Sequence, residues 1–206
     1  MKTRLQLLIA SANKGKVAEY RELLDGLECD LLSVDDAGIS GDVEETGTTY
    51  EENARLKAVT CAERSGLITL ADDSGLEVAA LGGEPGVRSA RYAGEHATDA
   101  QRVEYLLQKL KDVPPERRGA RFVCVIAMAV PGGEVTFCRG ECPGAIVMQP
   151  RGDKGFGYDP AFLLPELGVT VAELEPEVKN RLSHRGRAAV KARVVLEHFI
   201  DGGMSR

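Results

Sequence analysis

The sequence has few residues of the kinds that build disulfide frameworks or zinc sites. Its 206 residues include only five cysteines and three histidines. Because the cysteines are odd in number and spread along the chain, we expect reduced thiols rather than a disulfide framework. Cys138 and Cys142 have no second cysteine pair to complete a zinc site. Both are therefore interpreted as strand or core thiols.

The sequence also lacks a basic surplus and any long apolar run. Its formal net charge of -6 argues against non-specific binding to nucleic acid or anionic membranes, since both need a broad basic surface. No stretch could span a bilayer. The apolar run near the N-terminus is too short for a signal peptide, and Gln6 interrupts it. We therefore expect a cytoplasmic protein that binds neither nucleic acid nor membrane.

Repeats, low-complexity tracts and linkers are absent as well, and strand and helix signals alternate along the whole chain. This alternation is typical of an α/β protein with a mostly buried sheet. We expect one folded domain over residues 1–206. Strands are predicted near residues 4–11, 29–34, 67–71, 76–81, 120–130 and 134–147, and helices near 15–26, 48–66, 98–113 and in two segments that meet near Ser183.

Two adjacent aspartates, Asp72 and Asp73, follow the apolar residues 67–71 and precede a Ser-Gly pair. Side chains alternate along a strand, so both cannot enter the core, but both can reach a crevice at the strand end. Carboxylates there suit Mg²⁺, with one aspartate holding the metal and the other deprotonating an attacking water. The alternative is a polar turn in which the aspartates bond their own backbone.

The segment "SANKGK" lies where a strand leads into a helix, so free backbone N–H groups and the positive helix end favour an anion. Ser11, Asn13 and Lys16 add donors suited to phosphate oxygens. The alternative is that Asn13 only caps the helix and Lys16 is solvated. The pattern GxxxxGK[ST] is absent, so a Walker loop is not predicted.

Lys57 shares an apolar helix face with Asn53, four residues earlier. Its aliphatic stem could lie on that face with the ammonium in water. Alternatively, Lys57 faces a cleft that contains Glu44 or Glu45, the aspartate pair or a substrate phosphate. The residues alone leave both interpretations open.

Two C-terminal motifs could recognise a nucleotide base. In "GFGYDPAF", Phe156 and Tyr158 could stack on a base or belong to the core. In "SHRGRA", Ser183 is a candidate N-cap, and His184 and Arg185 are expected in an exposed first turn. A guanidinium can donate to a carbonyl oxygen but not to an exocyclic amine. The alternative is an ordinary solvated helix start.

Taken together, these motifs resemble the inosine/xanthosine triphosphate pyrophosphatase family. The blocks "EETGTTYEENARLKA", "ADDSGLEVAALGGEPGVRSARYAG", "GFGYDPAF" and "SHRGRA" occur in the family's order. The match extends over nearly the whole chain, from "IASANKGKVAEY" to "SHRGRA". The resemblance implies an α/β fold with a long, mixed, twisted sheet flanked by helices, and an active cleft between two lobes.

The resemblance further implies a homodimeric, Mg²⁺-dependent hydrolase of purine nucleoside triphosphates. Such an enzyme converts ITP, dITP and XTP to the monophosphate and pyrophosphate and so removes them from the nucleotide pool. Hypoxanthine and xanthine carry a carbonyl where adenine carries an amine, so a pocket of hydrogen-bond donors would reject adenine.

Site residues also follow from the resemblance. Asp73 would be the general base, Lys57 would contact the phosphates, and Mg²⁺ would bind to Glu45, Asp72 and Asp73, although the division of roles between the aspartates stays open. Ser11 stands where the family usually has threonine, which keeps the hydroxyl. The remaining substrate-binding residues would be Asn13, Lys16, Ser74, Phe156, Gly157, Tyr158, Asp159, Lys179, His184 and Arg185.

Three other classes compete with this interpretation. A septum-formation-inhibitor-like pyrophosphatase has a similar fold, but the intact "GFGYDP" and "SHRGRA" segments disfavour it. A nucleotide sensor would bind without hydrolysis, and metal-dependent turnover would distinguish it from an enzyme. A Nudix hydrolase would need a helix with clustered Arg and Glu residues, which is not found.

Overall fold

Two of the described α-helices begin at capping boxes that the sequence supplies. In the computed structural model, which describes residues 4–39 and 43–201, Thr49 caps one helix through a capping box with Glu52, and Gly66 (φ 70°) ends that helix. Thr98 and Gln101 form the same box at another helix. The α-helices of the described residues are α1 (Lys14–Leu23), α2 (Tyr50–Ser65), α3 (Asp99–Lys109), α4 (Pro176–Leu182) and α5 (His184–Asp201).

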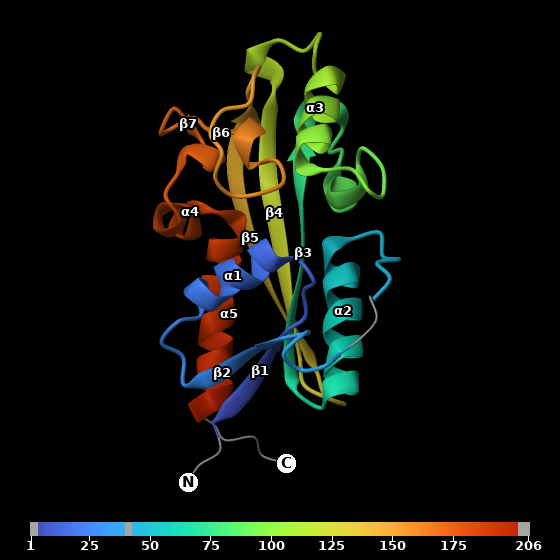
Figure 1. The fold of residues 1–206 in the computed structure, drawn as a ribbon, viewed down its shortest axis with the longest axis vertical. Helices are drawn as coiled ribbons and strands as arrows, with labels where there is room; N and C mark the ends of the chain where they lie inside the picture. Colours follow the sequence, from blue (N-terminus) through green and yellow to red (C-terminus); the bar gives the residue numbers. More distant parts are fainter. Residues whose placement is uncertain (1–3, 40–42, 202–206) are drawn as a thin grey trace. The chain divides into compact units, whose positions relative to one another are not determined.

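The strands of the described residues form one mixed sheet in the order β2-β1-β3-β4-β5-β6-β7. β1 runs parallel to both β2 and β3, whereas β6 is antiparallel to β5 and β7. This confirms the predicted α/β class with a mixed sheet and flanking helices (Figure 1). The strands are β1 (Leu5–Ile9), β2 (Cys29–Ser33), β3 (Ile68–Val78), β4 (Gly119–Ala129), β5 (Val135–Ile146), β6 (Phe162–Leu164) and β7 (Val169–Thr170).

The chain divides into two compact units, each with its own hydrophobic core. Unit 1 comprises residues 1–73, 124–140 and 186–206, and unit 2 comprises residues 74–123 and 141–185. The core of unit 1 includes Leu7 of β1, Tyr20 of α1 and Leu196 of α5, all with no exposed surface. The core of unit 2 includes Leu106 of α3 and Phe162 of β6. The active cleft between two lobes stays a prediction.

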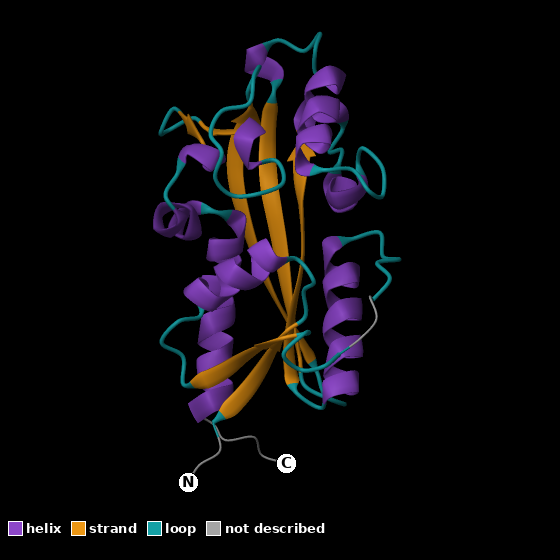
Figure 2. Ribbon diagram, viewed as in Figure 1, coloured by secondary structure: helices purple, strands orange, loops and turns teal. Residues whose placement is uncertain are grey.

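Within unit 1, helices lie on both faces of the strands. Side chains of α1 and α5 pack into the core cluster with β1, β3, β4 and β5. Figure 2 shows α2 on the other side of these strands. Residues of β3 can therefore meet different helices according to the face on which they lie.

The stretch "DDSG" is not a turn. The sequence predicts two strands, at 67–71 and 76–81, but the structure has the single continuous strand β3 over Ile68–Val78. Asp72 and Asp73 lie in its middle, only 1% and 5% exposed. The strand-end expectation and the polar-turn alternative are both wrong, because the two residues are extended inside β3, which lies between β1 and β4 in the sheet.

All five cysteines are buried and none forms a disulfide, as predicted. No helix among the described residues combines the length and apolar character needed to cross a membrane.

Candidate active site

The two aspartates of β3 bind different partners. The Lys16 ammonium lies 3.0 Å from Asp72 Oδ2, and Asn53 Nδ2 donates to Asp73 Oδ2 at 3.0 Å. Lys16 belongs to α1 and Asn53 to α2. Because successive side chains of a strand point to opposite faces, adjacent carboxylates can each have a partner without facing one another.

Lys57 links the acidic loop to β3. Its Nζ donates to Glu45 Oε1 and to the backbone carbonyl of Asp72, both at 2.6 Å. The Lys57 side chain is only 14% exposed, so the interpretation as a solvated surface lysine is wrong. Glu44, the other candidate partner, is exposed.

Charge around Lys57 controls its protonation. Burial disfavours the ammonium, but Asp72, Glu45 and Asp73 outweigh this cost and raise the pKa of Lys57 above its ordinary value. Lys57 therefore keeps its positive charge at neutral pH.

The pKa of Asp73 is also raised. Burial is the main cause, opposed by Lys57, and Glu45 adds to the rise while the hydrogen bond from Asn53 opposes it. A carboxylate with a raised pKa holds a proton more readily than an ordinary aspartate. Asp73 is therefore better suited to proton abstraction than a solvated carboxylate.

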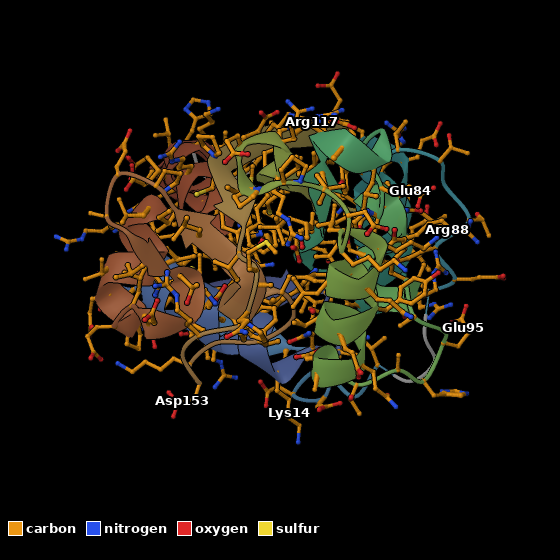
Figure 3. All side chains as sticks on the ribbon, turned by 90° about the horizontal axis from the view of Figure 1, so that it is seen from above. Lys14, Glu84, Arg88, Glu95, Arg117 and Asp153 are labelled. Carbon is orange, nitrogen blue, oxygen red and sulfur yellow. The ribbon has the colours of Figure 1, made fainter. Side chains whose placement is uncertain are left out.

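The segment "SANKGK" forms the helix cap that one alternative predicted, and its role as a phosphate site stays a prediction. Asn13 caps α1 by accepting from the Lys16 amide at 3.1 Å, and the amide of Asn13 donates to Ser11 Oγ at 3.2 Å. Lys16 itself is not solvated, because it is paired with Asp72 and its side chain is 16% exposed. The neighbouring Lys14 instead projects outward (Figure 3). The motif thus caps a helix and also delivers an ammonium group to β3.

Asn53 and Gly47 have roles that the sequence interpretation did not assign. Asn53 is fully buried, and its Oδ1 accepts from the Gly47 amide at 2.8 Å while its Nδ2 donates to Asp73. A Cβ atom at Gly47 would come within 2.6 Å of Asn53 Oδ1, so only glycine fits. The position of Asn53 four residues before Lys57, on the same helix face, was the available signal.

In unit 2, a buried carboxylate organises the segment 155–159. Asp159, only 4% exposed, accepts from Lys179 Nζ at 2.7 Å and from the Phe156 amide at 3.0 Å. Lys179 Nζ also lies 4.6 Å from the centre of the Phe156 ring. A Cβ atom at Gly155, where φ is 77°, would collide with the Asp159 carboxylate. The glycine therefore lets the loop close around Asp159.

The start of α5 is buried, which corrects the expectation of an exposed first turn. His184 and Arg185 are 6% and 2% exposed. His184 stacks on Phe122 with ring centres 4.7 Å apart, and Arg185 Nη2 donates to Ser74 Oγ at 3.1 Å. The alternative of a solvated helix start is wrong, because long-range packing covers residues that local sequence marks as polar.

Arg185 also approaches an aromatic ring. Its Cζ lies 5.5 Å from the centre of the Phe156 ring, which Lys179 approaches as well. Two cations thus lie near one partly exposed phenyl ring.

Tyr158 and Gly157 differ from each other in burial. Tyr158 belongs to the core of unit 2, and its hydroxyl donates to the Ser89 carbonyl at 2.9 Å. Its burial raises the pKa of the phenol. The Gly157 amide donates to Asp99 Oδ2 at 2.6 Å. The sequence interpretation assigned no role to Ser89 or Asp99.

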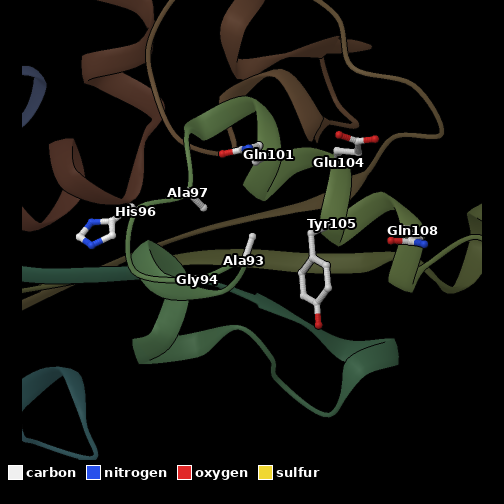
Figure 4. A pocket seen from close by; sticks show the side chains of 8 residues that line it. All are labelled: Ala93, Gly94, His96, Ala97, Gln101, Glu104, Tyr105 and Gln108. Atoms are coloured by element: carbon white, nitrogen blue, oxygen red, sulfur yellow. The ribbon is translucent and has the colours of Figure 1, made fainter.

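A hollow of about 480 Å³ lies beside α3 in unit 2. His96, Gln101 and Tyr105 are among the residues that line it (Figure 4). None of the predicted site residues lines this hollow. A smaller hollow of about 240 Å³ includes Ser11 and Lys14 in its lining.

The acidic groups of unit 1 fit a hard cation by their chemistry. Three carboxylates, from Glu45, Asp72 and Asp73, act on Lys57, and the Lys16 ammonium is paired with Asp72. Oxygen ligands of this type suit Mg²⁺. Within residues 4–39 and 43–201, no three His, Cys, Asp or Glu side chains are grouped closely enough to hold a metal.

Comparison with known proteins identifies the family. The model of the Ham1 family matches residues 7–194. The chain belongs to the Ham1 family. This membership confirms the resemblance inferred from the sequence motifs.

Curated relatives and solved Ham1 structures cover most of the chain. The dITP/XTP pyrophosphatase of Geobacter sulfurreducens is 52% identical over 89% of this chain and 92% of that protein. The dITP/XTP pyrophosphatase of Oceanobacillus iheyensis is 48% identical over 89% of this chain and 93% of that protein. The structure of a HAM1 protein from Coxiella burnetii has a TM-score of 0.85 at 45% identity, covering 93% of this Ham1 chain and 98% of that one.

Proposed function

We propose that this protein is a nucleoside triphosphate pyrophosphohydrolase that converts ITP, dITP and XTP to the monophosphate and pyrophosphate. The observation that carries the proposal is the buried Asp72–Asp73 pair with two lysines, in a chain about half identical to dITP/XTP pyrophosphatases. Hydrolysis would remove these nucleotides from the pool.

Asp73 is assigned as the general base. Its raised pKa suits it to accept a proton from a water molecule, and the hydrogen bond from Asn53 holds the carboxylate in one orientation. The water would attack the α-phosphorus, so that the α–β anhydride bond breaks and pyrophosphate leaves.

Lys16 and Lys57 are assigned to the phosphates, with Ser11 and Asn13 as further donors. Both ammonium groups are held by carboxylates and can offset negative charge that develops on the leaving group. Glu45, Asp72 and Asp73 are the candidate Mg²⁺ ligands; they are not grouped as a preformed metal site in the described residues, so they would have to come together on the ion. That ion would supply charge neutralisation and acidify a bound water.

The residues of unit 2 are assigned to the base. Phe156 offers a ring face for stacking, and His184, Arg185 and Lys179 are candidate donors to a carbonyl at the six position. Gly157, Tyr158, Asp159 and Ser74 would support this group rather than donate to the base. A pocket of donors disfavours adenine, because its amine would leave them unpaired.

The test is hydrolysis of a nucleotide panel in water enriched in ¹⁸O. Purified protein with Mg²⁺ would be incubated separately with ITP, dITP, XTP, GTP and ATP, and the products identified by ³¹P NMR. We expect pyrophosphate and ¹⁸O-labelled monophosphate from the inosine and xanthosine nucleotides only. Orthophosphate would mean cleavage at another phosphorus, and binding without turnover would favour a sensor.

Omission of Mg²⁺ tests the metal separately. We expect turnover to need the ion, with chelator-treated protein recovering activity when Mg²⁺ is restored. Unchanged turnover in chelator would remove the metal from the proposal. A homodimer and a cytoplasmic location are also proposed, and light scattering at micromolar protein would measure the first.

A further inference from the structure

The backbone of Gly157 is held by a side chain from a distant element of unit 2. Its amide donates to Asp99 Oδ2 at 2.6 Å, and Asp99 lies in the first turn of α3, 58 residues earlier. Gly157 follows Phe156, the ring assigned to base stacking. The position of Asp99 is therefore coupled to that of Phe156 through one peptide unit.

Packing alone does not hold Gly157 in place. A Cβ atom added there would meet no heavy atom within 4 Å. On the side of Asp99, both residues border a hollow of about 560 Å³ whose lining is mostly apolar, with Val103 and Pro160 among its residues. The backbone at Gly157 thus has room to shift, and the hydrogen bond to Asp99 opposes that shift.

Asp99 is itself held by Arg102. The Arg102 Nη2 group bonds Asp99 Oδ1, and Nη1 donates to the Ala90 carbonyl at 2.6 Å. Ala90 belongs to the short 3₁₀ helix Gly86–Arg91, whose Ser89 carbonyl accepts from Tyr158. Arg102 therefore connects the two anchors of the loop, one at Gly157 and one at Tyr158.

We propose that Asp99 and Arg102 are positioning residues that set the base-recognition loop 155–159. The proposal rests on the proposed function, since it assumes that Phe156 contacts the base. Their hydrogen bonds join α3 to Gly157 and Ala90 within unit 2, so we assign both residues to nucleotide binding rather than to water attack.

Kinetics of Asp99→Ala with ITP test the proposal. Loss of this hydrogen bond should raise KM by about three- to tenfold and leave kcat within about twofold. Asp99→Asn keeps an acceptor oxygen and should recover most of the loss. Glu104→Ala, which removes an exposed carboxylate from the same helix, is the matched control and should match the wild type.

A second measurement does not depend on catalysis. Hydrogen exchange of the Gly157 amide, followed by NMR on ¹⁵N-glycine-labelled protein, should accelerate in Asp99→Ala and in Arg102→Ala but not in Glu104→Ala. Unchanged exchange in Asp99→Ala would overturn the proposed anchor. Faster exchange with an unchanged KM, or a fall in kcat alone, would overturn its link to base binding.

The two measurements also separate this proposal from the proposed function. A wild-type protein that neither binds nor hydrolyses ITP would refute the function and, with it, the role in base binding. In that case the Gly157 exchange would still decide whether Asp99 holds the loop.

Discussion

The two units differ in the charged groups that they bury. In unit 1, the carboxylates of Glu45, Asp72 and Asp73 act on the ammonium of Lys57. In unit 2, the carboxylate of Asp159 accepts from Lys179, and both Lys179 and Arg185 lie near the ring of Phe156. The first group suits a hard cation and proton abstraction, whereas the second suits a flat base with carbonyl oxygens.

The charged groups of both units are stabilised in the same way. A buried charge is tolerated when a partner compensates it, and removing one partner costs much more than the pair contributes. Mutations in unit 1 should therefore affect turnover and stability, and mutations in unit 2 should affect the choice of base.

The largest effect is expected from Asp73→Asn. The amide cannot accept a proton, so kcat for ITP should fall by about 10²- to 10⁴-fold, the range for loss of a general base. Asp159→Asn is the matched change in unit 2 and should raise KM more than it lowers kcat. Near-normal kcat in Asp73→Asn would remove Asp73 from the role of base.

The second largest effect is expected from Lys57→Met, measured as the free energy of unfolding. It leaves Glu45 and the aspartate pair without their shared cation, so urea unfolding should show a loss of about 3–5 kcal/mol. Lys14→Met, at an exposed lysine of α1, should stay within about 0.5 kcal/mol of the wild type. Equal effects of the two changes would contradict the role of Lys57 as the shared cation.

Arg185→Ala should change selectivity. Arg185 is proposed to donate to the carbonyl at the six position of the purine. Its loss should lower the ratio of kcat/KM for ITP to kcat/KM for ATP by about tenfold. The ratio is insensitive to the folded fraction, because both substrates meet the same folded protein. Lys16→Ala in unit 1 should lower both values and leave the ratio unchanged; an unchanged ratio in Arg185→Ala would refute the assignment to the base.

The smallest effect is the pH dependence of stability in Asp73→Asn. The folded state raises the pKa of Asp73, so its stabilising contribution is full below the unfolded pKa, about 3.9, and is lost as pH rises through the folded value. Asn mimics the protonated group. Urea unfolding should therefore find the variant more stable than wild type at pH 7, with the difference vanishing near pH 4. If the stability difference between variant and wild type instead grew on acidification, the pKa of Asp73 would be lowered rather than raised by folding.

Local features of the fold could be predicted from the sequence. The sequence offers two capping boxes for α2, Thr48 with Glu51 or Thr49 with Glu52, and the structure forms the second. Gly66 ends the helix as its sequence position predicts, because these hydrogen bonds join residues close in the chain. The cap at Asn13 follows for the same reason. The family motifs also named most residues that the structure finds buried and charged.

Features that depend on distant contacts were missed or mistaken. β3 continues through the aspartates because neighbouring strands pair with it, and the Ser-Gly pair carries no sign of that pairing. The start of α5 is polar in sequence but buried, with Arg185 bonded to Ser74, 111 residues away. Asp99 belongs to no motif, and only folding brings it to Gly157.

By itself, the sequence determined the helix caps, the alternation of strands and helices and the motifs that mark the Ham1 family. The tertiary structure decided which helix each aspartate faces, that Lys57 binds Glu45 rather than water, and that Arg185 is buried. The physical reason is the separation in sequence between the interacting residues. A cap is satisfied within one helical turn, whereas the cost of burying a charge depends on partners that arrive from elsewhere in the chain.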